Sequence, residues 1–126
     1  MKKILIVDDE PHVLFVLKQF LERAGFEVFS ALNGQLALEL VEKEQPEVLI
    51  TDVQMPTMNG ISLCEALKSD ATGLPGLILL MTSRTDRDIR TWVDSQTNIV
   101  MLEKPLSMRH LVNRITDYFA NLGDCP

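Results

Sequence analysis

Five short apolar runs alternate along this chain with five longer segments whose apolar residues recur at helical spacing. The runs cover residues 3–7, 27–31, 47–52, 76–83 and 98–105. The longer segments cover residues 11–25, 33–45, 61–70, 84–96 and 107–122. A short continuous apolar run is typical of a strand buried on both faces, and regular alternation with helices is typical of a parallel sheet. We therefore predict an α/β fold of five successive strand–helix units.

The helical segments carry recognisable apolar faces and end signals. The first has apolar residues at helical spacing, namely Val13, Leu14, Val16, Leu17, Phe20 and Leu21. Pro11 suits its first turn and Gly25 suits its end. In the second segment we expect four apolar residues to be partly buried, namely Leu36, Leu38, Leu40 and Val41.

The length and the charge balance of the chain restrict its class. A chain of 126 residues, 46% of them hydrophobic, is long enough for one domain with a substantial core. We expect this domain to span residues 1–122, followed by a tail at residues 123–126. The 18 acidic residues outnumber the 12 basic ones, and the longest basic run is the pair Lys2–Lys3. Because nucleic-acid binding needs clustered positive charge, we expect no direct contact with DNA or RNA.

The two cysteines, Cys64 and Cys125, fit neither a metal-ligand spacing nor a disulfide framework. Cys64 lies in an apolar helical pattern, so we expect a core residue. The apolar run after Lys2–Lys3 is shorter than the ~7–15 residues of a signal peptide, and no segment approaches the ~18–20 apolar residues of a membrane span. These features favour a soluble, cytoplasmic protein that makes no membrane contact.

Chemically reactive side chains stand at the ends of four predicted strands. They are Asp8 and Asp9 after the first, Asp52 at the end of the third, Thr82 and Ser83 at the end of the fourth, and Lys104 with Pro105 at the end of the fifth. In parallel α/β sheets, ligands bind beyond the carboxyl ends of the strands. If the first, third, fourth and fifth strands are neighbours, these side chains converge on one shallow cleft.

This combination of side chains suits phosphoryl transfer. Neighbouring carboxylates repel one another, and Mg²⁺ relieves the repulsion by binding one or two of them together with water. A further carboxylate beside the metal can attack a phosphoryl group and form an aspartyl-phosphate. Lys104 and the Thr82 hydroxyl can stabilise the charge on the phosphoryl oxygens. The sequence contains no GK[ST] phosphate loop, which excludes a nucleotide-hydrolysing site of that type.

Each feature taken alone also has a purely structural explanation. The acids from Asp8 to Glu10 could favour the positive end of the first helix dipole, and Asp52 could belong to a turn. Thr82 could begin a helix, and Lys104 could be a surface lysine. We favour the functional interpretation because the groups stand at separate strand ends, and we assign only Glu10 to the helix start.

Four stretches of sequence together resemble the receiver domain of bacterial two-component response regulators. They read ILIVDDE, VLITDVQMPTMNG, LILLMTS and LEKPL, in the order and at the spacing of that family. The resemblance extends from Lys3 to about Leu122. It implies a flavodoxin-like, doubly wound (βα)5 fold whose parallel strands follow the order 2-1-3-4-5.

The resemblance also implies roles for the residues at the strand ends. Asp52 is expected to accept the phosphoryl group, Lys104 to bind it and Thr82 to move towards it afterwards. The expected Mg²⁺ ligands are Asp9, Asp8 (largely through a bound water), Asp52 and the main-chain carbonyl of Gln54. Gln54 and Arg84 stand where family members vary the lifetime of the phosphorylated state.

Other positions are expected to shape the loops and the output surface. Pro105 follows Lys104 across a bond that is often cis in this family, and Gly60 is expected to permit a turn after the acceptor. Met101 replaces the Tyr or Phe that usually serves as a rotamer switch, so we expect no aromatic switch.

The family's usual partner surface is the face of the fourth helix, fifth strand and fifth helix. On the fourth helix, Ile89, Trp92 and Val93 fit either core packing or an exposed docking patch.

Three functions compete on this reading. The first is a phosphorylation-controlled signalling receiver that takes its phosphoryl group from a histidine kinase or phosphotransfer protein. Such a receiver catalyses its own phosphorylation and dephosphorylation with Mg²⁺ but has no conventional substrate. The second is a constitutive interaction module, which Met101 alone supports. The third is a Mg²⁺-dependent phosphohydrolase, which would usually need a second acid just after Asp52 and a cap that this chain is too short to contain.

Overall fold

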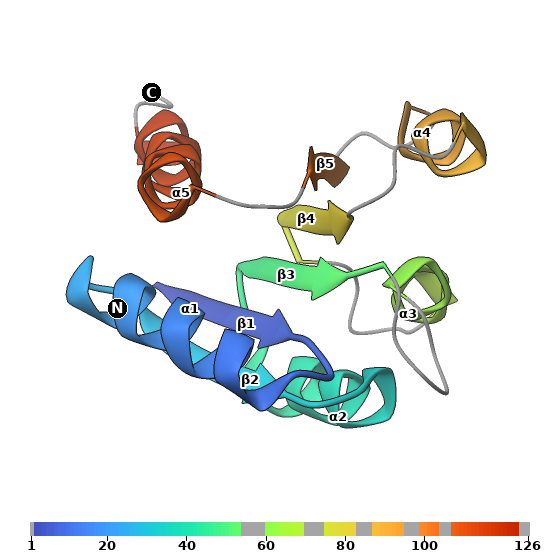
Figure 1. The fold of residues 1–126 in the computed structure, drawn as a ribbon, viewed down its shortest axis with the longest axis horizontal. Coiled ribbons are helices and arrows are strands. Elements are labelled where there is room, and N and C mark those ends of the chain that lie inside the picture. The colour runs from blue at the N-terminus through green and yellow to red at the C-terminus, as the bar shows by residue number, and fades with distance from the viewer. Residues whose placement is uncertain are drawn as a thin grey trace.

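The computed structural model describes residues 2–53, 60–69, 75–82, 87–94, 99–103 and 107–123. The strands are β1 (Lys3–Val7), β2 (Glu27–Ala31), β3 (Val48–Asp52), β4 (Leu77–Thr82) and β5 (Ile99–Glu103). The helices are α1 (Pro11–Arg23), α2 (Gly34–Glu44), α3 (Gly60–Ser69), α4 (Arg87–Asp94) and α5 (Met108–Gly123). All ten elements lie where the sequence predicts them, in strict strand–helix alternation (Figure 1).

The five strands form one parallel sheet in the order β2-β1-β3-β4-β5. This confirms the predicted doubly wound fold and its strand order. The strand order reverses at β1, because the chain passes from β1 outward to β2 and then crosses back to β3 on the other side. In sheets of this kind the reversal point lies beside the ligand-binding crevice.

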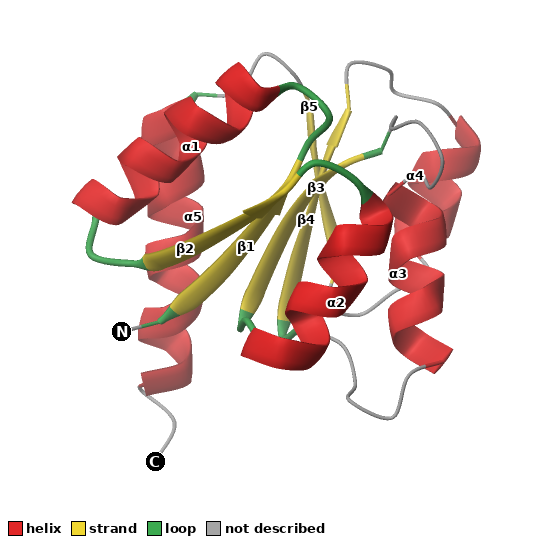
Figure 2. Ribbon diagram, turned by 90° about the horizontal axis from the view of Figure 1, so that it is seen from below, coloured by secondary structure: helices red, strands yellow, loops and turns green. Residues whose placement is uncertain are grey.

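Helices cover both faces of the sheet. Figure 2 shows α1 and α5 on one face and α2, α3 and α4 on the other. Each face has its own apolar core, because side chains alternate between the two faces along a strand. Ile4, Ile6 and Ile50 belong to the core beneath α1 and α5, whereas Leu5 and Leu49 belong to the core beneath α2, α3 and α4.

Burial distinguishes the central strands from the edge strands. Every residue of β3 and β4 is buried, and so is β1 apart from Lys3. The outer strands β2 and β5 each contain exposed or half-buried positions, among them Ser30 and Glu103. This difference is expected, since an edge strand contacts only one neighbour and receives less cover from the helices.

Helix α1 buries a narrow apolar stripe and begins and ends as the sequence predicts. Its buried residues are Leu14, Leu17 and Leu21, spaced by three and four residues so that they share one side. Pro11 lies in the first turn. Beyond the helix, Gly25 has a φ of 98°, a left-handed conformation that glycine adopts without steric cost.

Helix α2 departs from one expectation. Asn33 caps its amino end, because the side-chain oxygen accepts a hydrogen bond from the N–H of Leu36 at 2.9 Å. Ala37 and Val41 are buried, and Leu38 and Leu40 pack partly against the core. The prediction that Leu36 is partly buried too is wrong: it lies in the first turn on the outer side and is exposed.

Candidate functional site

Asp52 occupies the last position of the central strand β3. It continues the alternation of Val48 and Ile50, which places its side chain on the sheet face covered by α1 and α5. Its exposed fraction is 7%. The main chain at this point is fixed on both sides, since β3 pairs with β1 up to Thr51 and with β4 up to Asp52. Asp52 is therefore a mostly buried carboxyl group at the carboxyl edge of a rigid sheet.

Asp8 lies beside this position on the neighbouring strand. Val7, the last residue of β1, is in register with Thr51, so Asp8 and Asp52 each follow directly after a paired residue. Adjacent strands are about 4.8 Å apart, which brings the two residues together at the sheet edge. The main-chain N–H of Asp8 donates a hydrogen bond to the carbonyl of Ala31 at 3.2 Å and so ties the start of this loop to the end of β2.

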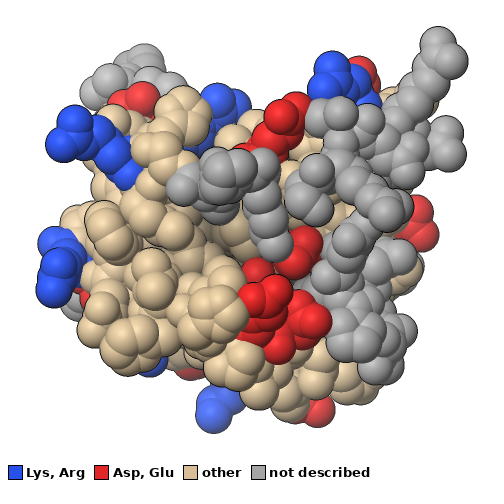
Figure 3. Space-filling view, in the orientation of Figure 1, with Lys and Arg blue, Asp and Glu red and all other residues tan. Residues whose placement is uncertain are grey.

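Asp8, Asp9 and Glu10 form an acidic cluster. One carboxylate oxygen from each lies within 4.8 Å of the others, the spacing expected of oxygen ligands around a single cation. Asp8 is 1% exposed, whereas Asp9 and Glu10 are exposed. In Figure 3, acidic side chains gather near the middle of one face of the molecule, beside a broad uncharged surface over α1.

This cluster fits the predicted Mg²⁺ site by its chemistry. Mg²⁺ prefers carboxylate oxygens and water, and the cluster offers oxygen ligands both below the surface and at the surface. Burial of a carboxylate is costly unless its charge is compensated, and Asp8 Oδ1 accepts a hydrogen bond from the N–H of Glu10 at 3.0 Å. A divalent cation beside Asp8 and Asp9 would compensate their charges further.

Glu10 takes the position expected for a helix-start residue. It is the residue that precedes α1, and its carbonyl accepts hydrogen bonds from the N–H groups of Val13 and Leu14. Its carboxylate pairs with His12 Nε2 at 3.2 Å, at the surface. The side chain of Glu10 therefore has a partner on the helix, while its main chain supports Asp8.

Thr82 ends β4 and is 1% exposed. It is in register with Glu103, the last residue of β5, which Lys104 follows in the sequence.

Met101 is half-buried in β5 and packs against the core beneath α2, α3 and α4, as does Trp92 of α4. Val93 is buried, so core packing is the correct interpretation for this residue of the fourth helix.

Gly60 supports the site for a reason that the sequence did not reveal. Its N–H donates to the carbonyl of Val53 at 2.9 Å, and its φ lies outside the left-handed region. A Cβ at this position would stand 2.6 Å from the carbonyl oxygen of Asp52. Close approach to the main chain of Asp52, and not the turn conformation that we expected, requires a glycine here.

Five of the residues predicted at the site lie outside the described part of the chain, namely Gln54, Ser83, Arg84, Lys104 and Pro105. Their roles remain predictions. Cys125 lies outside it too, whereas Cys64 is fully buried as expected. Among the described residues, no helix combines the length and the apolar character that crossing a membrane requires.

The sequence matches the family described as the response regulator receiver domain over residues 4–116. The chain belongs to this family. Receiver domains are signalling modules of two-component systems and not conventional enzymes, so the match favours a signalling module over the phosphohydrolase that the sequence left open.

Curated relatives of this receiver domain differ in length. PilH of Pseudomonas aeruginosa is 31% identical over 120 residues, which are 95% of this chain and 99% of PilH. The alkaline phosphatase synthesis transcriptional regulatory protein PhoP of Bacillus subtilis is 38% identical over 85 residues, 68% of this chain and 35% of PhoP. The DNA-binding response regulator MtrA of Mycolicibacterium smegmatis is 32% identical over 115 residues, 90% of this chain and 49% of MtrA. The chain thus spans nearly all of PilH but half or less of the other two.

Solved structures agree with this assignment. The chemotaxis protein CheY4 of Vibrio cholerae superposes with a TM-score of 0.84 and 28% identity, over 93% of this chain and 98% of CheY4. The signal receiver domain of a histidine kinase from Syntrophus aciditrophicus reaches a TM-score of 0.84 with 27% identity, over 100% of this chain and 96% of that domain. The fold is therefore that of the CheY-like receivers.

Proposed function

We propose that this receiver domain accepts a phosphoryl group on Asp52 from a phosphohistidine donor and then changes its affinity for a downstream partner. The observation that carries the proposal is the register that sets Asp8 and Asp52 side by side, with the acidic cluster next to them. The donor is a histidine kinase or a phosphotransfer protein. The partner is a separate protein or an attached output domain, and the reaction belongs to the cytoplasm.

The transfer itself needs few groups. A carboxylate oxygen of Asp52 forms a bond to phosphorus while the bond from phosphorus to the donor's imidazole nitrogen breaks, and the electron pair of that bond stays on the nitrogen. Asp52 is suited to this attack because the paired strands hold its main chain on both sides. Its small exposed fraction keeps most water away from the acyl phosphate that forms.

The acidic cluster prepares Asp52 for a negatively charged substrate. Bound Mg²⁺ supplies the positive charge that offsets the carboxylates and the phosphoryl oxygens. Asp9 is exposed and would be a direct ligand, whereas the buried Asp8, oriented by the N–H of Glu10, would act through water. Asp52 and the carbonyl of Gln54 complete the proposed ligand set, and Lys104 neutralises further phosphoryl charge.

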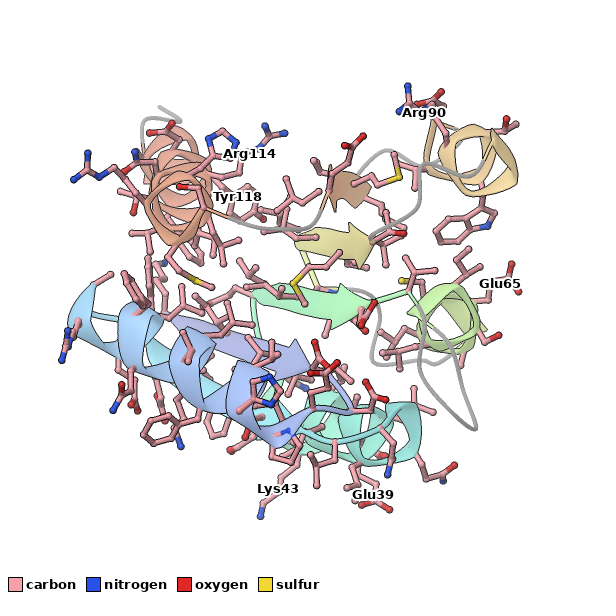
Figure 4. The ribbon with its side chains drawn as sticks, viewed as in Figure 1. Glu39, Lys43, Glu65, Arg90, Arg114 and Tyr118 are labelled. Carbon is pink, nitrogen blue, oxygen red and sulfur yellow. The ribbon has the colours of Figure 1, made fainter. Side chains whose placement is uncertain are left out.

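We expect the output to pass through Thr82. Its hydroxyl is drawn towards the phosphoryl group, which moves the end of β4. Glu103 is the register partner of Thr82 in β5, and its carboxylate lies 3.9 Å from the guanidinium of Arg90. Figure 4 shows Arg90 on α4. A shift at Thr82 therefore has a short route to α4 and to the face formed by α4, β5 and α5.

The direct test is phosphorylation by a small donor. The protein is incubated with acetyl phosphate and Mg²⁺, and its intact mass is measured. We expect one phosphoryl adduct per chain, which is absent when EDTA is added and absent in Asp52→Asn. An adduct of equal yield in Asp52→Asn would place the acceptor elsewhere and refute the assignment.

A second test separates a switch from a constitutive interaction module, the function that Met101 alone favours. A binding partner is isolated with the wild-type domain, and its affinity is measured with and without acetyl phosphate. A switch predicts an affinity change that Asp52→Asn abolishes. Equal affinities in both conditions, with full phosphorylation, would establish the constitutive module instead.

A further inference from the structure

The edge strand β2 directs some of its main-chain hydrogen-bonding groups away from the sheet. At its two ends, the N–H of Glu27 and the carbonyl of Ala31 form hydrogen bonds with residues that flank β1, at 2.9 and 3.2 Å. Alternate residues of a strand in a parallel ladder bond to the same neighbour, so Phe29 faces β1 as well. The main-chain groups of Val28 and Ser30 therefore point to the open edge. Figure 2 shows β2 as the outermost strand on this side, with α1 and α2 on opposite faces.

The middle of β2 lacks the residues with which proteins commonly block an open edge. Such residues are Lys, Pro and inward-pointing charges. Val28, Phe29 and Ser30 are uncharged, and the first two favour the strand conformation. Ser30 is exposed and Phe29 is half-buried, so another strand can reach this edge. A second strand would supply partners for the main-chain groups of Val28 and Ser30.

A groove runs along the same edge on the α1 side. It has a volume of about 320 Å³ and lies between α1 and the end of β2. Phe15 is 63% exposed although it lies in the middle of α1, and Leu32, just after β2, is 45% exposed. A partner that approaches β2 from its open side would bury these apolar side chains. The groove is lined by Pro11, Leu14, Phe15, Lys18, Ser30 and Leu32.

The side of α1 towards this groove carries opposite charges. Pro11, Phe15, Lys18 and Glu22 follow one another at spacings of four, three and four residues, so they share one side of the helix. Lys18 and Glu22 are thus about one turn apart. In two antiparallel copies of α1, Lys18 of one copy lies beside Glu22 of the other, and the reciprocal pair forms at the same time. One two-fold axis therefore matches the charges of both copies.

We infer that β2 is an interface between two copies of this chain, whose β2 strands pair antiparallel about a two-fold axis at Phe29. In this register Val28 of each copy lies opposite Ser30 of the other, and each such pair exchanges two main-chain hydrogen bonds. Phe29 packs on the α2 side of the sheet, where it meets the Phe29 of the other copy. Helix α1 packs against β2 on the other side, so the two α1 helices meet there. The inference concerns self-association and does not depend on phosphorylation.

The size of the contact predicts a weak dimer. A five-residue strand spans about 17 Å and a helix of 13 residues about 20 Å, so the contact is short. We expect it to bury at most roughly 600 Å² per partner, the range of transient complexes. Each copy has a net charge of −6, which opposes association further. A dissociation constant of roughly 10–100 µM is therefore expected.

Sedimentation equilibrium at roughly 5–500 µM protein and 0.15 M salt measures this association. Ser30→Pro removes an N–H that faces the open edge, where proline is tolerated, and should weaken the dimer by at least about tenfold. Ser30→Ala keeps the N–H and should change the dissociation constant by less than about threefold. Phe15→Ser should weaken the dimer by at least about threefold. Phe20→Ser should leave it unchanged, since Phe20 is 44% exposed but lies about 140° around the helix from Phe15.

A charge exchange tests the antiparallel arrangement of α1. Lys18→Glu and Glu22→Lys each place like charges together at two points, so each should weaken the dimer by at least about fivefold. The double variant restores opposite pairs and the wild-type net charge, and should return to within about twofold of the wild type. An effect of net charge alone would move the two single variants in opposite directions.

A disulfide reports the register. Phe29→Cys places two thiols at the axis, where the Cα atoms of an antiparallel pair are about 4.5 Å apart, close enough for a disulfide. Glu27→Cys is the control, because its two copies stand about 13 Å apart although Glu27 is the more exposed residue. Both variants carry Cys125→Ser, and Cys64 is buried. We expect mild oxidation to yield a covalent dimer of Phe29→Cys and none of Glu27→Cys.

Several results would overturn the inference. A wild type that stays monomeric up to about 500 µM has no such interface. A dimer that Ser30→Pro leaves intact, or equal cross-linking at residues 27 and 29, would assign the interface to another surface. Failure of the double charge variant to recover would reject the antiparallel arrangement. If circular dichroism shows that Ser30→Pro does not fold, the charge and disulfide variants decide.

The outcome is separate from that of the proposed function. Asp52→Asn should dimerise like the wild type, so a failure of phosphorylation leaves the sedimentation and disulfide experiments unaffected.

Discussion

The main chain of Glu10 holds Asp8 in place, because the Glu10 N–H donates to Asp8 Oδ1 at 3.0 Å while the Glu10 carboxylate pairs with His12. The main chain and the side chain of Glu10 therefore have different roles. The main-chain contact survives any substitution other than proline, whereas the side chain serves the start of α1.

This division leads to a prediction about Mg²⁺ affinity. Asp9→Asn removes a proposed direct ligand and should weaken Mg²⁺ binding by at least about tenfold, whereas Glu10→Gln should weaken it by less than about threefold. Isothermal titration with MgCl₂ measures both. Equal losses in the two variants would show that Glu10 is a ligand as well.

The acidic cluster should also destabilise the metal-free protein. Two carboxylates about 4 Å apart in water repel by about 1 kcal/mol, so Asp9→Asn should raise the free energy of unfolding in EDTA by roughly that amount. Mg²⁺ should stabilise the wild type and leave Asp9→Asn nearly unchanged. Urea unfolding with and without MgCl₂ checks this, and a variant less stable than the wild type in EDTA would contradict it.

A separate prediction concerns Gly60. In Gly60→Ala the new Cβ would meet the Asp52 carbonyl, so the main chain of the acceptor or the start of α3 has to shift. We expect a loss of about 1–3 kcal/mol in stability and a slower phosphorylation by acetyl phosphate. Gly25→Ala is the control: it is strained by its φ of 98° but meets no atom within 4 Å. It should lower stability without slowing phosphorylation, and an equal slowing in both variants would reject a local effect at Asp52.

Tyr118 of α5 provides a prediction about pH, far from the candidate site. Burial, and then the nearby charge of Glu47, raise the pKa of the Tyr118 hydroxyl above 10.0. Above about pH 10 the unfolded chain loses this proton while the folded chain keeps it, so the free energy of unfolding falls as the pH rises towards the folded-state pKa. Tyr118→Phe should lack this part of the decline. Urea unfolding from roughly pH 8 to pH 11 tests it, and parallel curves for the two proteins would contradict it.

The residue pattern predicted the fold well where both faces of a strand are buried. The runs that became β1, β3 and β4 read as continuous apolar stretches because helices cover both sides of them. The strand order could not come from such runs, since all of them look alike. The predicted strand order came from the resemblance to a family. The exposed positions of β2 and β5 agree with their place at the edges, but this became visible only in the structure.

Helix faces were harder to predict, because apolar spacing does not tell which side meets the core. Leu36 fits the apolar pattern of α2, yet it lies on the outer side of the first turn. Val16 and Phe20 fit the pattern of α1 and are nevertheless exposed, and Phe15 lay outside the pattern. The groove at Phe15 depends on the position of Leu32 beside α1, which only the tertiary structure supplies.

The same limit applies to the candidate site. Parallel strands place their carboxyl ends at one edge, so the sequence could predict that Asp8 and Asp52 meet. It could not predict the contact between Gly60 and the main chain of Asp52, because no local signal distinguishes a glycine needed for close approach from one needed for a turn.

The last prediction uses Trp92, the only tryptophan of the chain, as a reporter of the switch. Trp92 lies half-buried on α4 and packs against the same core as Met101 of β5, so a movement of α4 should change its surroundings. We expect acetyl phosphate with Mg²⁺ to change the fluorescence of the wild type but not of Asp52→Asn. Thr82→Val should still gain the phosphoryl adduct in its mass spectrum yet lose most of the fluorescence change, because the missing hydroxyl no longer draws the end of β4 towards the phosphoryl group. A full fluorescence change in Thr82→Val would mean that the signal reaches α4 by a route other than Thr82.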